Sequence, residues 1–411
     1  MNKKKIFNDP VYGFISVQSD LIFDIIQHPY FQRLRRIKQL GLTDFVYPGA
    51  LHTRFHHAIG AMHLMEQALE SLRSKGHMIF DAEAEAAIIA ILLHDIGHGP
   101  FSHTLEFSLF RDIHHEQITL WTMKKLNREF GGRLDMAIQV YQGHYPRKFL
   151  TQLVSSQLDT DRMDYLQRDC FFTGVSEGTI GAERIIKMLN LVDDELVVEE
   201  KAIYSLENFL SARRLMYWQV YLHKTAISAE RMLIELIKRA KKLTQEGKEI
   251  TATPALKLFL ERDITQKDFE DDPDILDVFM VMDDTDIWGS IKFWSNHKDR
   301  VLHTISKMLL HRKLFRVKLL NEKTPKESYD QLVGEVARAW DFSETDARYF
   351  VRKGTVTNAA YIASGQSIKV LMKDGTVLDV AHATDLPNIK AMSKIVKKYY
   401  LCWPKDINFT A

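Results

Sequence analysis

The spacing of apolar residues predicts helices from the N-terminus to about residue 240. Segment 81–96 is apolar on nearly all sides from Ala86 onward, which is typical of a buried helix. It ends at Gly97, with Pro100 just beyond, as helices commonly end. Segments 211–242 and 284–310 contain few helix-breaking residues, and we expect each of them to be helical as well.

The pattern changes in the second part of the chain. Residues 244–274 are charged and less regular and contain Gly247, Pro254 and Pro273, so we place a domain boundary there. Further on, segments 367–372 and 376–380 flank a Lys-Asp-Gly turn, which indicates a β-hairpin. We expect a mainly α fold, with a helical body at residues 1–243. A smaller mixed α+β part at residues 244–411 would serve packing and oligomerisation.

Composition and charge narrow the class of protein. Apolar residues make up 45% and charged residues 27%, a balance typical of a globular chain. The net charge is +1, so no global field draws the chain to nucleic acid or to a membrane. The two cysteines, Cys170 and Cys402, lie far apart and fit a reducing compartment. We expect a cytoplasmic protein without a signal peptide, because the N-terminus is basic and then polar. The longest apolar run near the motifs, 86–93, is shorter than the ~20 residues of a membrane span.

Motifs of several other protein classes are absent. The sequence has no G-x-x-x-x-G-K-[ST] phosphate loop and no G-x-S-x-G nucleophile elbow. Lysines recur over 238–242 and 390–398, but no nucleic-acid-binding motif accompanies them. We interpret the first of these runs as a solvated helix face, with an effector site between subunits as the alternative.

Histidines gather in two short stretches. Of the 17 histidines, eight lie in these stretches, and the second stretch opens with the doublet His94 and Asp95 at the end of the predicted buried helix. Imidazole and carboxylate suit a divalent first-row metal. A His-Asp pair at the end of a buried helix would be costly without such a partner. The histidines of the first stretch are His52, His56 and His57, and those of the second are His94, His98, His103, His114 and His115.

A third motif, LDTDRMDYLQRD at 158–169, places four carboxylates around two arginines. Asp161, Asp164 and Asp169 do not all share one helical face. One carboxylate can therefore complete a metal site while another turns toward a sugar hydroxyl or an arginine.

These motifs, in this order, resemble a known enzyme family. The order His57, His94 and Asp95, then Asp161 is the H…HD…D pattern of the HD superfamily of phosphohydrolases. The flanking segments NDPVYG, FQRLRRIKQLG, TRFHHAIG, HDIGHGPFSH, HHEQ and DTDRMDYLQRD are similar to its deoxynucleoside triphosphate (dNTP) triphosphohydrolase branch, over about residues 5 to 235. The vertebrate member of that branch carries a SAM domain before its HD domain, and we expect none here.

The resemblance implies a role for each matching residue. It implies a divalent ion (Fe, Mn, Zn, Ni, Co or Mg) on His57, His94, Asp95 and Asp161. It also implies that His98, His103, His115 and Glu106 orient the attacking water or protonate the leaving oxygen, although His98 and His103 could instead be structural caps after Gly97. The implied substrate contacts are Gln39, Arg54, Arg162, Tyr165, Asp169, Arg213, Tyr217, Tyr221 and Lys224.

Three positions depart from the pattern of the vertebrate relative. Glu106 stands in place of its aspartate, Tyr217 in place of a histidine, and Arg162 in place of a phosphate-binding lysine. A nucleotide effector site between subunits is implied at Lys5, Asn8, Gln32 and Arg35. Gln27 occupies the position of the acidic residue that reads guanine, which leaves the effector's base open.

The sequence thus predicts metal-dependent hydrolysis of dNTPs to deoxynucleoside and triphosphate, with nucleotide activation and a homo-oligomer (dimer or tetramer) implied by the relatives. One alternative is another HD phosphohydrolase, a nucleotide phosphatase or phosphodiesterase, because the same metal cage serves those reactions. The other alternative is a non-catalytic regulator that binds nucleotides or nucleic acid. Intact His98, His103 and His115 argue against it, because a pure binder does not need proton-transferring groups.

Overall fold

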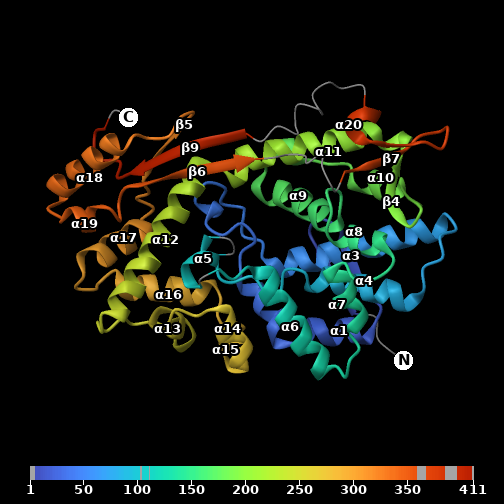
Figure 1. The fold of residues 1–411 in the computed structure, drawn as a ribbon, viewed down its shortest axis with the longest axis horizontal. Coiled ribbons are helices and arrows are strands. Elements are labelled where there is room, and N and C mark those ends of the chain that lie inside the picture. Colours follow the sequence, from blue (N-terminus) through green and yellow to red (C-terminus); the bar gives the residue numbers. More distant parts are fainter. Residues whose placement is uncertain (1–4, 102–103, 111, 359–366, 385–395, 410–411) are drawn as a thin grey trace.

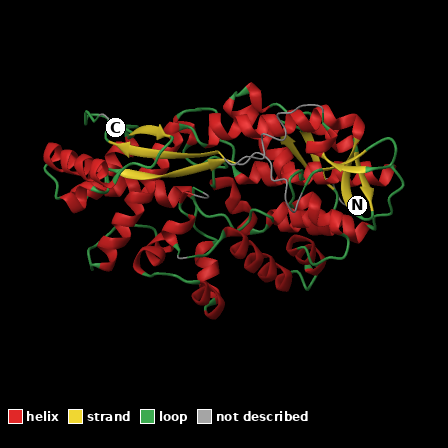
Figure 2. Cartoon of the chain, turned by 45° about the horizontal axis from the view of Figure 1, so that its top comes forward, coloured by secondary structure: helices red, strands yellow, loops and turns green. Residues whose placement is uncertain are grey.

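The computed structural model describes residues 5–101, 104–110, 112–358, 367–384 and 396–409. Helices dominate, and small groups of strands lie toward the two ends of the molecule (Figures 1 and 2). Buried apolar side chains from both parts of the chain belong to one continuous core. The prediction of a mainly helical fold with a smaller mixed part is confirmed. In the described part of the chain, no helix combines the length and the apolar character that crossing a membrane requires.

The described helices of the first part are α1 (Asp20–Gln27), α2 (Pro29–Gln32), η1 (Arg33–Arg36), η2 (Thr43–Phe45), α3 (Arg54–Ser74), α4 (Asp81–Leu93), α5 (Glu106–Leu109), α6 (His115–Glu129), α7 (Asp135–Gln142), α8 (Lys148–Val154), α9 (Thr160–Thr173), η4 (Ser176–Gly178), α10 (Ala182–Lys187), η5 (Glu200–Ala202), α11 (Ile203–Met216), η6 (Tyr217–Tyr221) and α12 (Lys224–Gln245). Those of the second part are α13 (Pro254–Glu261), α14 (Gln266–Asp271), α15 (Pro273–Phe279), α16 (Asp284–Trp294), α17 (Arg300–Leu310), α18 (Lys326–Trp340), α19 (Glu344–Ala347) and α20 (Val380–Ala383).

Three helices form the centre of the helical body. Helix α3 packs against both α4 and α9, and α4 packs further against α7 and α8. Helix α4 is buried over most of its length, as its apolar pattern predicts, and it ends at Leu93 with His94 as its C-cap. Helix α9 is capped at its start by Asp159, whose side chain accepts a hydrogen bond from the backbone N–H of Arg162 at 2.7 Å. The ends of α4 and α9 therefore place the His-Asp doublet and the third motif beside α3.

The strands form three small sheets. The described strands are β1 (Lys5–Asp9), β2 (Gly13–Val17), β3 (Leu189–Val192), β4 (Glu195–Glu199), β5 (Arg316–Leu320), β6 (Arg352–Asn358), β7 (Lys369–Leu371), β8 (Val377–Asp379) and β9 (Val396–Trp403). Their orders are β1-β2, β3-β4-β7-β8 and β5-β9-β6. The predicted hairpin is confirmed: β7 and β8 are antiparallel, and the turn between them contains Gly375 at φ +87°. Strand β7 also pairs in parallel with β4, so the two parts share a sheet across the predicted boundary at residue 243.

Two predicted long helices are each divided in the structure. Segment 211–242 is not one helix: α11 ends at Met216, a π-helical turn follows, and α12 starts at Lys224. At His223 the backbone is extended, and its ring accepts a hydrogen bond from the N–H of Thr225 at 3.1 Å, so it caps α12. Segment 284–310 divides into α16 and α17, because Asp299 caps the second helix. Histidine and aspartate caps of this kind interrupt a helical pattern without glycine or proline.

Candidate active site

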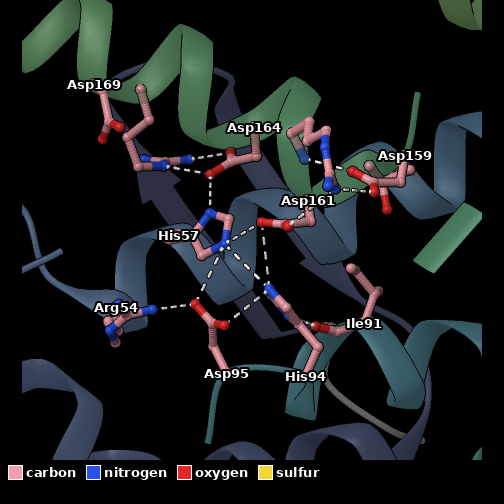
Figure 3. A network of polar contacts seen from close by, with 12 residues as sticks. Arg54, His57, Ile91, His94, Asp95, Asp159, Asp161, Asp164 and Asp169 are labelled. Atoms are coloured by element: carbon pink, nitrogen blue, oxygen red, sulfur yellow. Dashed lines mark hydrogen bonds and ion pairs between the residues drawn. The ribbon is translucent and has the colours of Figure 1, made fainter. Parts of the chain in front are cut away.

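Four side chains from α3, the end of α4 and α9 converge on one point (Figure 3). The Nε2 atom of His57 lies 3.3 Å from Nε2 of His94, 3.1 Å from Oδ1 of Asp161 and 3.7 Å from Oδ2 of Asp95. The Nε2 atom of His94 lies 3.3 Å from Oδ1 of Asp95 and 3.4 Å from Oδ1 of Asp161. The structure therefore brings together the four residues predicted to bind metal, which come from three separate segments.

The spacing of these donor atoms fits a single divalent ion. Ligand atoms about 2.1 Å from one ion lie about 3.0–3.4 Å apart in octahedral or tetrahedral coordination, which matches most of the separations here. Two imidazoles and two carboxylates are a donor set that first-row metals accept. Burial opposes ionisation of Asp161, but hydrogen bonds from His57 and His94 outweigh it and lower its pKa. A carboxylate that remains ionised at neutral pH is what metal binding requires.

The outer nitrogens of the two imidazoles are held by the protein. His57 Nδ1 donates to Oδ2 of Asp164 at 2.7 Å, and His94 Nδ1 donates to the carbonyl of Ile91 at 2.6 Å. These contacts leave both Nε2 atoms turned toward the common point. A carboxylate that receives the outer N–H of a histidine fixes its tautomer and makes it a better metal ligand.

Asp164 belongs to a buried ionic chain. It accepts two hydrogen bonds from Arg168, at 3.0 and 2.9 Å, and Arg168 also donates to Asp9 at 2.7 Å. Asp164 and Arg168 are both fully buried. The sequence indicated that one carboxylate of this motif faces away from the metal, but it did not identify Asp164, because its partner His57 lies 107 positions away.

A cavity of about 640 Å³ opens beside the four-residue cluster, which is within the usual size range of ligand sites. Arg54 lines it and forms a buried ion pair with Asp95. Arg162 lines it as well and pairs with Asp159, the N-cap of α9. Two guanidinium groups thus stand next to the cluster, where they can bind phosphate oxygens in pairs.

Two of the predicted catalytic histidines, His98 and His115, lie beside Asp95. His98 Nε2 is 3.4 Å from Oδ1 of Asp95, and its ring stacks on that of His115 with centroids 3.8 Å apart. Glu106 accepts hydrogen bonds from the backbone N–H and from Nδ1 of His115, at 2.7 and 2.8 Å. Burial and the charge of Arg54 hold the pKa of His98 well below its usual value, so this ring is neutral at pH 7. His103 lies outside the described residues.

Aromatic and polar side chains also line the cavity. Ring centroids of His57 and Tyr165 are 6.5 Å apart, and those of Tyr165 and Tyr221 are 6.2 Å apart. Tyr221 donates to Asp169 Oδ2 at 2.7 Å, and the other oxygen of Asp169 pairs with His52 at 2.7 Å. His52 is buried and stacks on Phe172, with its ring bonded to Asp169.

Of the remaining residues predicted to contact substrate, some line the cavity and others do not. Gln39 and Tyr217 line the cavity, and the buried side-chain oxygen of Gln39 has no hydrogen-bond partner among the described residues. Arg213 does not line the cavity; it is buried and donates to Gln157 at 3.2 Å. Lys224 is exposed at the start of α12 and does not line the cavity either.

The four predicted effector residues lie on β1 and around α2 and η1. Lys5 lies over the ring of Phe23 at 4.8 Å and Arg35 over the ring of Phe55 at 3.5 Å. The side chain of Gln32 accepts from Arg35 at 2.8 Å. Asn8 is part of β1, and Gln27 is exposed at the end of α1. Their use as an effector site remains a prediction.

Replacement of Gly97 by alanine is expected to destabilise the protein by about 1–3 kcal/mol and to displace His115. A Cβ atom at this position would clash with the His115 carbonyl oxygen and the Thr119 amide nitrogen, both on the backbone of α6. Urea unfolding measures the loss in the free energy of unfolding. Gly289→Ala on α16 is the matched control, because nothing lies within 4 Å of its Cβ position. Equal unfolding midpoints for the two variants would contradict the prediction.

Comparison with known proteins places the same residues in a common domain. The chain matches the HD domain over residues 54–169 and the HD associated region over residues 180–259. The crystal structure of a phosphohydrolase from Bacteroides thetaiotaomicron superposes with a TM-score of 0.95 at 51% identity, covering 98% of this chain and 100% of that one. All four residues of the cluster, His57, His94, Asp95 and Asp161, fall within the HD domain match.

Two curated proteins show the same relationship at lower identity. The uncharacterized protein YwfO of Bacillus subtilis is 34% identical over 340 residues, which cover 81% of this chain and 76% of YwfO. The deoxynucleoside triphosphate triphosphohydrolase SAMHD1 of Gallus gallus is 28% identical over 385 residues. That match covers 82% of this chain but 60% of the chicken protein, so the likeness does not extend over that whole enzyme.

Proposed function

The chain belongs to the HD superfamily of phosphohydrolases, and we propose that it hydrolyses dNTPs at the α-phosphate to deoxynucleoside and triphosphate. One observation carries the proposal: the cluster of His57, His94, Asp95 and Asp161 borders a cavity that is also lined by Tyr165, Tyr221 and Gln39. That combination suits a phosphate chain at the cluster and a sugar and base against the aromatic and amide side chains. The name of the chicken relative, a dNTP triphosphohydrolase, supports the same substrate class.

The four cluster residues would hold the divalent ion, which as a Lewis acid polarises a phosphate oxygen and lowers the pKa of an attacking water. Arg54 and Arg162 would bind phosphate oxygens and stabilise the charge that develops there. Water would form the new bond to the α-phosphorus while the bond to the 5′ oxygen breaks, and that oxygen must gain a proton. His98 and His115 would move protons, with Glu106 holding the ring of His115.

Deoxynucleotides are expected to be hydrolysed about 10- to 200-fold faster than ribonucleotides in kcat/KM. The ring of Tyr165 lies near both His57 of the cluster and Tyr221, where it would crowd a 2′-hydroxyl. Paired assays of dGTP against GTP and of dATP against ATP measure the ratio. Tyr165→Ala should lower the ratio of kcat/KM for deoxynucleotides to that for ribonucleotides. Equal rates for both sugars in the unaltered enzyme would exclude this role of the ring.

Product analysis tests the proposed reaction. The purified protein is incubated with each of the four dNTPs, singly and mixed, with Mn²⁺ or Mg²⁺, and the products are separated by anion-exchange chromatography. We expect triphosphate and deoxynucleoside in equal amounts. Turnover in mixtures but not with single nucleotides would support the predicted effector site. Release of orthophosphate or pyrophosphate would favour another HD phosphohydrolase, and binding without turnover would favour the regulator.

A further inference from the structure

One acidic residue that lines the cavity differs from the others in its contacts. The acidic residues that line the cavity are Asp95, Asp161, Asp169, Glu116 and Glu230. The first four each have a partner: Arg54 for Asp95, His57 for Asp161, Tyr221 for Asp169, and His115 for Glu116. Among the described residues, none forms a hydrogen bond or an ion pair with Glu230. Its carboxylate is therefore available to a ligand.

The next acidic residue on α12, unlike Glu230, has charged partners. Glu235, the next acidic residue on the helix, is buried and pairs with both Lys238 at 3.2 Å and Arg352 at 3.1 Å. Burial raises the pKa of the Glu230 carboxyl to about 7, and Arg231 beside it offsets this only in part. A carboxyl group that is desolvated and still lacks a partner gains much from a ligand that donates hydrogen bonds.

The position of Glu230 along the cavity determines which part of a nucleotide it can meet. The ring of Tyr165 lies near both His57 of the metal cluster and Tyr221, and Leu222 and α12 follow Tyr221 in the chain. Glu230 lies six residues after Lys224, about 9 Å further along the helix axis. Helix α12 packs against η2, whose Thr43 lines the cavity together with Leu40.

A triphosphate does not fit at this end, because it would meet the charge of Glu230 without a cation. The cations that line the cavity, Arg54 and Arg162, stand beside the cluster instead. A nucleotide with its phosphates at the cluster and its sugar near Tyr165 would therefore direct its base toward Leu40, Thr43, Leu222 and Glu230.

We propose that Glu230 reads the nucleobase and favours guanine, an inference that rests on the proposed function. A carboxylate offers acceptors only. The Watson–Crick edge of guanine presents two adjacent donors, N1–H and the 2-amino group, which one carboxylate accepts together. Adenine and cytosine present one donor next to an acceptor, and thymine presents one donor between two acceptors. The expected order of preference is dGTP, then dATP and dCTP, then dTTP.

Internal competition tests the proposal. Equal amounts of the four dNTPs are hydrolysed in one vessel at pH 8 by the metal-loaded protein, so that any activation affects all substrates equally, and the ratios of kcat/KM are taken from the rates of depletion. Glu230→Gln keeps the shape but replaces one acceptor by a donor. We expect the preference for dGTP over dTTP to fall about 10- to 100-fold, with little change for dTTP itself.

Two controls separate base reading from a structural effect. Glu246→Gln, at the C-terminal end of the same helix and half-exposed, makes the same chemical change and should leave all ratios unchanged. In the unaltered protein, dITP, which lacks the 2-amino group, should be disfavoured relative to dGTP, and Glu230→Gln should reduce that difference. An equal loss for all four dNTPs, or an unchanged ratio of dGTP to dTTP, would overturn the proposal.

The inference and the proposed function can fail separately. If dNTPs are hydrolysed but the ratios do not depend on Glu230, the function stands and the inference fails. If no dNTP is hydrolysed, the proposed function fails, and equilibrium dialysis of dGTP and dTTP against both proteins then decides the inference. Tighter binding of dGTP that is lost in Glu230→Gln would support base reading, and equal binding of the two nucleotides would overturn it.

Discussion

His94→Ala and Asp95→Ala proteins are expected to lose bound metal and at least about 10³-fold in dNTP hydrolysis. Each side chain contributes a donor atom 3.3–3.7 Å from its neighbours in the cluster. The remaining ligands cannot move to replace a lost donor, since His57 is fully buried and held by Asp164. Elemental analysis gives the metal content per chain, and initial rates at saturating Mn²⁺ give the activity.

A histidine outside the cluster provides the control for this experiment. His63 stands on α3, as His57 does, but its ring bonds with Gln67 at 2.9 Å, so His63→Ala should retain both metal and rate. Asp95 also pairs with Arg54, which makes His94→Ala the cleaner variant. A His94→Ala protein with full metal content and an unchanged rate would exclude the four-residue site.

Asp164→Ala is expected to destabilise the protein by about 3–5 kcal/mol and to weaken metal binding about 10- to 100-fold, although Asp164 is not a predicted ligand. The change leaves the buried Arg168 with Asp9 as its remaining carboxylate partner and removes the acceptor of His57 Nδ1. Urea unfolding in the presence of a chelator reports the first effect, and competition with a metal-binding dye reports the second.

A double-mutant cycle shows whether these effects come from the buried pair. Arg168→Ala alone is also destabilising, but the double variant should lose much less than the sum of the two single losses, because in the double variant neither Asp164 nor Arg168 is left buried without the other. The exposed pair Glu183 and Lys187 on α10, with the same i, i+4 spacing, should show almost no coupling. Additive losses for Asp164 and Arg168 would contradict the ionic chain.

Much of the fold follows from local patterns. The apolar run before His94 predicts a buried helix that ends near the doublet, and α4 is that helix. The Lys-Asp-Gly turn predicts the hairpin of β7 and β8. Both features depend on residues close together in the sequence. The parallel pairing of β7 with β4 does not, because it joins segments more than 170 positions apart.

The candidate site was likewise predictable from the sequence only in part. Residue types and motif order are enough to identify His57, His94, Asp95 and Asp161 as candidate metal ligands. The contacts of Asp164, His52 and Glu230 could not be assigned from the sequence, because they are defined by what these residues face across the fold. His52 is an example: one histidine among three in its stretch, it is distinguished by burial and by its bond to Asp169, 117 positions away.

Hydrolysis of a dNTP in water enriched in ¹⁸O tests the central claim most directly, since the proposed site directs water to the α-phosphorus beside His57, His94, Asp95 and Asp161. After a single turnover, mass spectrometry locates the label. The account predicts one ¹⁸O in the triphosphate and none in the deoxynucleoside. Label in orthophosphate or pyrophosphate, with a nucleotide as the other product, would contradict it.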